Sequence, residues 1–289
     1  MMAASDRAGT LHVVATPIGN LADLSPRVRA VLEEADLVLA EDTRHTGALL
    51  RHLGLEKPLR SLHEHNEAER VESVLERLRK GEQVALLSDA GTPLVSDPGY
   101  RLLAAVREQG LRASPVPGPC AAIAALCVSG LATDRFAFEG FLPQRRGARR
   151  ARLQALADEP RTLVIYEAGR RVSAALEDMA DIFGPQRRAT LARELTKLYE
   201  DISHGTLESL AAHTRREPFG TRGEFVLVVE GSPPRESVQR QDPAQVLGIL
   251  LAELPLKQAA ALAARLTGVS RNELYRQGLA LRNGNEDPG

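Results

Sequence analysis

Over residues 10–130, five short apolar segments alternate with five segments that carry helix signals, and this alternation constrains the fold more than any other feature. The helical segments show starts such as Ser25-Pro26 and stops such as Gly54. Strands and helices that alternate in this way form a parallel sheet with right-handed crossovers. We therefore expect an α/β domain at residues 10–132, with strands in "LHVVAT", "DLVLAE", "PLRSLH", "QVALL" and "LRASPV".

A polar cluster follows each of these five predicted strands. In a parallel sheet the carboxyl ends of the strands share one edge, so the five clusters can meet there and hold a ligand. A single cluster could be an ordinary loop, but five in register favour a real site. In the long polar loop that begins with "SDAGTP" we expect Asp97 to cap the next helix, with Pro98 at its first position. The clusters are "TPIGN" (16–20), "EDTRHT" (41–46), "HEHN" (63–66), "SDAGTP" (88–93) and "PGPCA" (117–121).

The pattern changes after residue 132. Strand candidates and helices mix over residues 133–231, which predicts a second α/β domain with a mixed sheet. A polar linker at 231–242 leads into a helical tail at 242–289. In the tail, Asp242 and the Ser270-x-x-Glu273 box start helices, and the spacing is that of a helix-turn-helix. The tail is either a nucleic-acid contact module with Arg271 and Arg276 on its second helix or a plain helical hairpin that packs on the body.

The charges of the chain are nearly balanced, at a formal net charge of −1, so a protein that coats nucleic acid through a global basic excess is excluded. One local run is basic, and either it binds RNA phosphates or it is a solvated helix face. Its candidate RNA-binding residues are Arg145, Arg146, Arg149 and Arg150.

Other sequence signals bear on location and cofactor class. Cys120 and Cys127 lack metal-ligand spacing and fit reduced thiols in a cytoplasmic protein, and the N-terminus lacks the apolar core of a signal peptide. Prolines break the uncharged run at 113–133, so we expect no membrane span. Dinucleotide, P-loop and zinc-protease motifs are missing, and we expect no metal. Strand-end loops beside a small-residue helix, with donors at its N-terminus near Pro119, permit S-adenosylmethionine without singling it out.

Several motifs occur in order along the chain: "VATPIGNLADLSPR", "AEDTRHTGALL", "LHEHNE", "LLSDAGTPLVSDPG", "PVPGPCAAIAAL", "FEGFLP", "ARELTKLYE" and "GEFVLVVEG". Over about residues 10–231 the chain thereby resembles the tetrapyrrole methylase (class III methyltransferase) family. Within that family it is similar to the bacterial branch that methylates the 2′-hydroxyl of a cytidine ribose in the decoding region of 16S ribosomal RNA, and the tail fits this branch. The resemblance implies two α/β domains, S-adenosylmethionine in the cleft between them, a homodimer, and 16S ribosomal RNA or the small ribosomal subunit as partner.

The resemblance also implies which residues surround the methyl donor. One departure is that tetrapyrrole-modifying members often carry Gly-Asp-Pro where this chain has Gly91-Thr92-Pro93, which puts contacts within 89–93 in doubt. The implied cofactor-binding residues are Pro17, Gly19, Asp89, Gly91, Thr92, Val95, Ser96, Cys120, Ala121, Tyr166 and Leu195.

Methyl transfer to a ribose hydroxyl is helped by a base that removes the hydroxyl proton. Asp42 is the first candidate, with His45 and His65 behind it, and Arg44 is a candidate for holding a neighbouring phosphate. Asp42 could instead only cap the following helix, and Arg44 could only pair with Glu41. Two other functions stay open: a tetrapyrrole (corrinoid-precursor) methyltransferase, and a non-enzymatic RNA-binding ribosome assembly factor.

Overall fold

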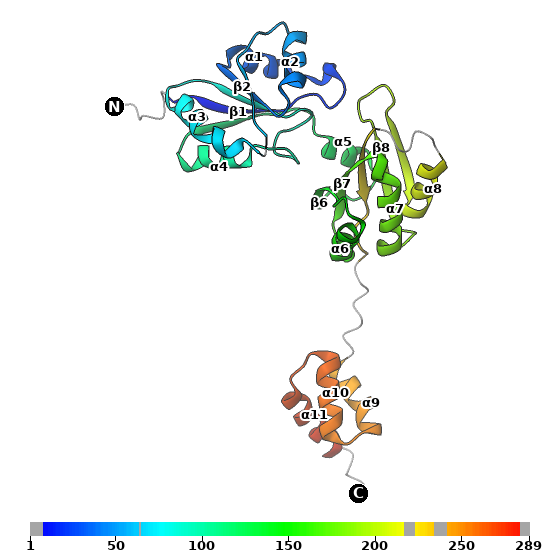
Figure 1. The fold of residues 1–289 in the computed structure, drawn as a ribbon. Helices are drawn as coiled ribbons and strands as arrows, with labels where there is room; N and C mark the ends of the chain where they lie inside the picture. Colours follow the sequence, from blue (N-terminus) through cyan, green and yellow to red (C-terminus); the bar gives the residue numbers. More distant parts are fainter. Residues whose placement is uncertain (1–7, 64, 217–222, 234–241, 284–289) are drawn as a thin grey trace. The chain divides into compact units, whose positions relative to one another are not determined.

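The computed structural model describes residues 8–63, 65–216, 223–233 and 242–283, and the chain divides into two compact units, 1–231 and 232–289 (Figure 1). The first unit contains two five-stranded sheets, and the second contains three helices. The division of residues 10–231 into two domains at 132/133 stays a prediction.

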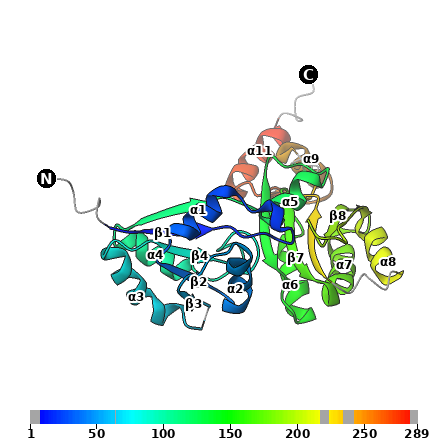
Figure 2. The same cartoon turned by 90° about the horizontal axis from the view of Figure 1, so that it is seen from above.

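The first sheet is parallel throughout and has the order β3-β2-β4-β1-β5, of which Figure 2 shows the first four strands side by side. The five predicted strands are therefore confirmed, and their carboxyl ends share one edge. The strands are β1 (Thr10–Val14), β2 (Leu37–Ala40), β3 (Leu59–Ser61), β4 (Val84–Leu87) and β5 (Arg112–Val116).

Helices cover both faces of this sheet because alternate strand residues point to opposite sides. One face carries Val14 and Val38 and is covered by α1 (Pro26–Glu34) and α2 (Thr43–His52). The other carries Leu11, Leu37 and Leu39 and is covered by α3 (Glu67–Arg79) and α4 (Tyr100–Glu108). A short 3-10 helix, Leu21–Asp23, follows β1.

The second sheet is mixed, as the sequence predicted, with the order β6-β7-β10-β8-β9. Only β6 and β7 pair in parallel, and the other neighbours are antiparallel. The strands are β6 (Phe136–Phe141), β7 (Thr162–Ala168), β8 (Arg188–Arg193), β9 (Asp201–Thr206) and β10 (Glu224–Val229).

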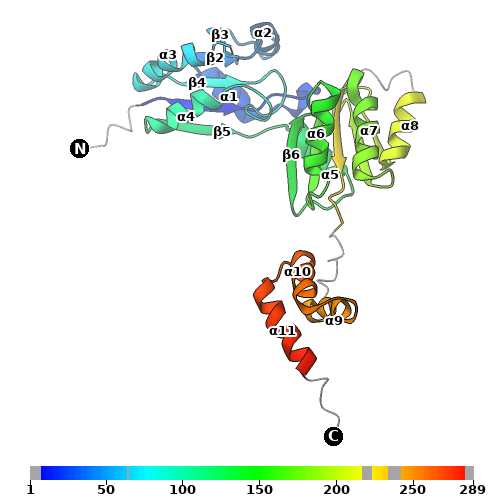
Figure 3. The same ribbon diagram turned by 60° about the horizontal axis from the view of Figure 1, so that its bottom comes forward.

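Three helices cover one face of the second sheet, and α5 (Ala121–Val128) covers the other (Figure 3). Residues 121–128 were expected to complete the first domain, but Ala122, Ala125 and Leu126 pack against Val164 and Val226 of the second sheet. The segment is apolar around its whole circumference, so its sequence does not indicate which sheet it covers. The three other helices are α6 (Arg146–Leu156), α7 (Gly169–Phe183) and α8 (Leu207–Arg216).

The tail forms its own small core, in which Leu247, Ala259, Ala263 and Leu274 are fully buried. Its helices begin where the sequence predicted. Asp242 accepts a hydrogen bond from the Ala244 N–H, and the Ser270 hydroxyl accepts one from the Glu273 N–H. The helices are α9 (Pro243–Glu253), α10 (Leu256–Thr267) and α11 (Arg271–Asn283).

Candidate active site

A cavity of about 380 Å³ lies where the carboxyl end of the first sheet meets the second sheet. Its walls come from the loop after β4, the start of α5, and strands β6, β7, β8 and β10. Most of the implied cofactor residues line it, namely Asp89, Gly91, Thr92, Val95, Ser96, Cys120, Ala121, Tyr166 and Leu195. The structure thus brings together nine residues from four separate segments of the sequence.

The loop after β4 is clamped to the loops that follow β1 and β5. Gly91 exchanges two backbone hydrogen bonds with Thr16, at 2.8 and 3.1 Å, and the Thr92 hydroxyl donates to the Pro119 carbonyl at 3.0 Å. Gly91 has a φ of 89°, and an added Cβ would lie 3.3 Å from Ile18 Cγ2. A side chain at this position would therefore meet both backbone strain and a crowded cavity wall.

The end of this loop corrects one expectation from the sequence. Asp97 does not cap the next helix and Pro98 is not its first residue, because α4 begins at Tyr100 with Gly99 as its cap. Gly99 has a φ of 120°, a conformation open to glycine, and Leu94 and Ser96 also have positive φ values, of 72° and 71°. The strained backbone turns the Asp97 residue into the wall of the cavity instead of onto the helix end.

Asp97 is the functional candidate that the sequence analysis missed. Its partial burial, together with the negative charges of Glu41 and Asp89, raises the pKa of its carboxyl from 3.8 to about 7, although a hydrogen bond with Ser88 opposes this. The sequence Ser96-Asp97-Pro98 is typical of a helix start, so the sequence predicted a helix cap at Asp97 and not a position in the cavity wall.

The Tyr166 side chain of β7 lies against the N-terminus of α5. The Ala122 N–H donates to the Tyr166 hydroxyl at 3.0 Å, so this helix donor, which was expected to serve the methyl donor, already has a partner. Burial and the neighbouring Cys120 thiol raise the pKa of Tyr166, which therefore stays protonated. The rings of Phe138 and Phe141 meet Tyr166 edge-on, at centroid distances of 5.0 and 5.6 Å.

Two implied cofactor residues lie outside the lining of this cavity. Pro17 lines a second cavity of about 200 Å³, together with His45 and Asp89. Gly19 packs so closely against the loop after β8 that a Cβ there would clash with the Lys197 side chain. Gly19 therefore fixes the two loops against each other at the edge of the site.

Asp42, the first candidate for accepting the hydroxyl proton, is held by Arg44. Asp42 caps α2 by accepting a hydrogen bond from the Arg44 N–H at 2.8 Å. The Arg44 guanidinium also donates hydrogen bonds to both carboxylate oxygens of Asp42. The hydrogen bonds from Arg44 lower the pKa of Asp42 strongly, so it is a weak base. The structure thus pairs Arg44 with Asp42, two residues before it. His65 is exposed and contacts the His63 ring. Neither Asp42 nor His65 lines the main cavity.

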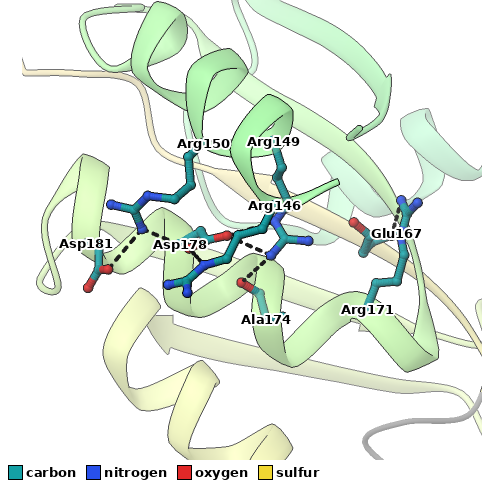
Figure 4. A network of polar contacts seen from close by, with 8 residues as sticks. All are labelled: Arg146, Arg149, Arg150, Glu167, Arg171, Ala174, Asp178 and Asp181. Carbon is teal, nitrogen blue, oxygen red and sulfur yellow. Dashed lines mark hydrogen bonds and ion pairs between the residues drawn. The ribbon is translucent and has the colours of Figure 1, made fainter. Parts of the chain in front are cut away.

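The arginine run on α6 faces an acid that is distant in the sequence (Figure 4). Asp178 of α7 is only 2% exposed and lies 2.7 Å from Arg149, 2.8 Å from Arg150 and 3.3 Å from Arg146. The Arg149 side chain is 6% exposed, so the structure does not support a direct RNA contact for it. Arg146 is 73% exposed and Arg145 is exposed at the helix start, and these two remain accessible to a phosphate.

The charge of the cavity suits a cation. Asp89, Asp97, Glu167 and Glu224 line it, and none of the described lining residues is Lys, Arg or His. Glu167 accepts from Arg171, and Glu224 pairs with Lys197, while Asp97 has a raised pKa. The volume falls within the range of about 300–1,000 Å³ for small-molecule sites. The residues therefore fit a compact, mostly apolar ligand that carries positive charge.

Two absences hold for the residues that the structure describes. No helix in that part of the chain combines the length and apolar character needed to cross a membrane. No group of three or more His, Cys, Asp or Glu side chains there is arranged to hold a metal ion.

Comparison with known proteins agrees with this geometry. A model of the family described as Tetrapyrrole (Corrin/Porphyrin) Methylases matches residues 10–211, and one described as the RsmI C-terminal HTH domain matches residues 239–282. Among solved structures, a uroporphyrin-III-C-methyltransferase from Thermus thermophilus has a TM-score of 0.55 at 24% identity and covers 86% of this chain and 99% of its own. The methyltransferase CobJ has a TM-score of 0.58 at 22% identity, with coverage of 78% and 95%. These two likenesses show the fold.

Curated relatives are much more similar. Proteins named ribosomal RNA small subunit methyltransferase I are 54% identical in Pseudomonas aeruginosa, 48% in Haemophilus influenzae and 49% in Escherichia coli O157:H7. The matches cover 94%, 96% and 96% of this chain and 97%, 98% and 96% of the relatives. The chain therefore belongs to the tetrapyrrole methylase family of S-adenosylmethionine-dependent methyltransferases.

Proposed function

We propose that this protein transfers a methyl group from S-adenosylmethionine to the 2′-hydroxyl of a cytidine ribose in 16S ribosomal RNA. The observation that carries the proposal is the identity of 48–54% to proteins named ribosomal RNA small subunit methyltransferase I, which extends through the tail. The uroporphyrin-III-C-methyltransferase and CobJ structures share only the fold with this chain, at 24% and 22% identity, so they carry no argument for its substrate.

The cavity supports the choice of methyl donor. S-adenosylmethionine supplies a methyl group on a positively charged sulfonium, and transfer leaves a neutral thioether. The acidic side chains of the wall favour a cation, and Ile18, Ala192 and Leu195 give it an apolar part that suits the rest of the ligand. Gly91 and Ala121 leave room for the ligand to approach the backbone, so we place the donor against these two residues.

The surface supports an RNA substrate. Arg145 and Arg146 at the start of α6 are exposed, as are Arg271 and Arg276 on α11 of the tail. Guanidinium groups bind phosphate through paired hydrogen bonds, and such contacts give RNA affinity that depends on salt. We assign these four residues to substrate binding. A homodimer and a cytoplasmic location also stay predictions.

Methyl transfer from labelled S-adenosylmethionine to bacterial small ribosomal subunits that lack this modification tests the proposal. We expect label in 16S RNA at one cytidine, in a linkage that resists alkaline hydrolysis because the 2′-oxygen is blocked. Protein-free 16S RNA, run in parallel, shows whether the assembled subunit is required. Label on a base, or transfer to a tetrapyrrole but not to RNA, would contradict the proposal.

A further inference from the structure

We propose that the Asp97 carboxylate accepts the proton of the attacking ribose hydroxyl, an inference that rests on the proposed function. It replaces the assignment of that role to Asp42. The inference depends on where the Asp97 loop holds its carboxylate and on which charges surround it.

Geometry places Asp97 at the meeting point of the two sheets. Asp97, its neighbour Ser96, and Phe141 at the end of β6 all line the main cavity. Gly140 (φ 62°) lies so close to this loop that a Cβ there would be 3.1 Å from Ser96 Oγ. Phe141 is 57% exposed although it lines the cavity, so an aromatic residue that is open to solvent lines the same cavity as the carboxylate. An aromatic ring that is open to solvent offers a nucleotide base a stacking surface.

The loop is held rigidly, as a proton acceptor must be if it is to meet a hydroxyl at hydrogen-bond distance. Gly91 and Thr92 fix its first half through Thr16 and Pro119. In its second half Leu94 and Ser96 keep positive φ values, which cost free energy for residues with side chains. Strain of this kind persists where the surrounding structure enforces it, and it is concentrated at functional sites.

The charges that face Asp97 are negative or neutral. Glu41 follows β2, Asp89 follows β4, and the Tyr166 hydroxyl comes from β7. Burial and the two acids raise the pKa of Asp97 to about 7, close to the value at which a general base is most effective at neutral pH. A bound sulfonium would favour the ionised form and lower this pKa when the donor is present.

The proposed step balances in atoms and charge. As the bond between the ribose oxygen and the methyl carbon forms, the bond between that carbon and sulfur breaks, and its electron pair stays on sulfur. The hydroxyl proton passes to the Asp97 carboxylate. The sulfonium and the carboxylate, one positive and one negative, become a neutral thioether and a neutral carboxylic acid. The acid then returns its proton to water.

The test measures single-turnover methyl transfer to small ribosomal subunits for the wild type, Asp97→Asn, Asp97→Glu and Asp42→Asn. For Asp97→Asn we expect a loss of about 10²–10⁴-fold in the rate at saturating substrate. We expect Asp97→Glu to recover part of it. The wild-type rate should rise with pH to a plateau, with a midpoint at or below about 7, and this rise should vanish in Asp97→Asn.

Two further readouts do not depend on turnover. By calorimetry, Asp97→Asn should weaken S-adenosylmethionine binding far less than it lowers the rate, because Asp89 keeps its carboxylate in the cavity wall. A loss of affinity that matches the loss of rate would make Asp97 a cofactor ligand and overturn the proposal. In carbon-13 NMR of the wild type without ligand, the Asp97 carboxyl, assigned by its loss in Asp97→Asn, should titrate near 7. A midpoint near 4 would overturn the proposal as well.

The outcomes separate this inference from the proposed function. If the wild type methylates 16S RNA and Asp97→Asn does so at the same rate, only the role of Asp97 is refuted. If Asp42→Asn rather than Asp97→Asn abolishes the pH dependence, the role belongs to Asp42. A wild type that does not methylate the RNA of the subunit refutes the proposed function, and with it the ribose hydroxyl as the source of the proton.

Discussion

Asp178 of α7 pairs with three arginines of α6, Arg146, Arg149 and Arg150. Removing its carboxylate should destabilise the first unit more than any other single change among these four residues. Asp178 and Arg149 are almost fully buried, and their charged groups are 2.7 Å apart. In Asp178→Ala, the Arg149 guanidinium would stay buried with only a 3.5 Å contact to the Ala174 carbonyl. Breaking a buried ion pair by removing one partner costs about 3–5 kcal/mol, because an uncompensated charge remains.

The sign of the pH dependence follows from the cluster. Burial alone would raise the pKa of Asp178, but the hydrogen bonds from Arg150 and Arg149 outweigh it and lower the pKa below 3.8. The stabilisation by the ionised carboxylate is therefore present above about pH 4. It is lost as the pH falls through the lower pKa of the folded state. The difference in the free energy of unfolding between the wild type and Asp178→Ala should therefore become smaller as the pH falls below about 4.

Urea denaturation of the full chain at pH 7, followed by circular dichroism, measures the loss. The matched control is Asp181→Asn, since Asp181 is 63% exposed and pairs only with Arg150, at 3.1 Å. This exposed pair should contribute less than about 1 kcal/mol. The double variant Asp178→Leu with Arg149→Met should recover most of the lost stability, because neither charge then remains buried. A loss for Asp178→Ala no larger than that of the control would refute the reasoning.

Three other changes test the site, the surface and the tail. Gly91→Val should abolish S-adenosylmethionine binding in a folded protein, because the site has a positive φ and Ile18 lies 3.3 Å from an added Cβ; unchanged affinity by calorimetry would count against the site. Arg145→Ala should weaken RNA binding and reduce the slope of log K against log salt by about 0.7–0.9, and an unaltered slope would leave Arg145 without a phosphate contact. A chain that ends at Gly231 should fold and bind the methyl donor, because 232–289 is a separate compact unit, but it should bind RNA less tightly. Aggregation of that chain with unchanged RNA affinity would show that the tail only covers the body.

Local patterns in the sequence predicted most of the fold. Apolar segments bounded by caps and glycines placed all five strands of the first sheet, and Ser270 and Asp242 placed helix starts in the tail. These features depend on residues within a few positions of one another. The side of the sheet that α5 covers could not be predicted in this way, because the helix is apolar all round and its partner strands lie beyond residue 160.

The parts of the site that the sequence analysis missed depend on distant contacts. Arg149 pairs with Asp178, 29 residues further along, and no local pattern identified that partner. Asp97 occupied a position where a helix cap was equally consistent with the sequence. Only the positive φ of Gly99 and the contact of Ser96 with Gly140 show that the chain turns differently. Resemblance to a family identified nine lining residues because it carries information about residues that are remote in the chain.

Asp97 illustrates how a site can be built against the stability of the fold. A carboxyl whose pKa is raised from 3.8 to about 7 stabilises the folded state least when it is ionised. As the pH rises from about 4 to 7, the chain therefore loses stability, because the unfolded chain releases the Asp97 proton at a lower pH than the folded chain does. Replacing Asp89 would relieve part of this cost, but it would also remove a negative charge that favours a cation in the cavity. A positively charged ligand relieves the same cost only while it is bound. The carboxylates of Asp89 and Asp97, which lower the stability of the free protein, thus also favour binding of a cationic methyl donor.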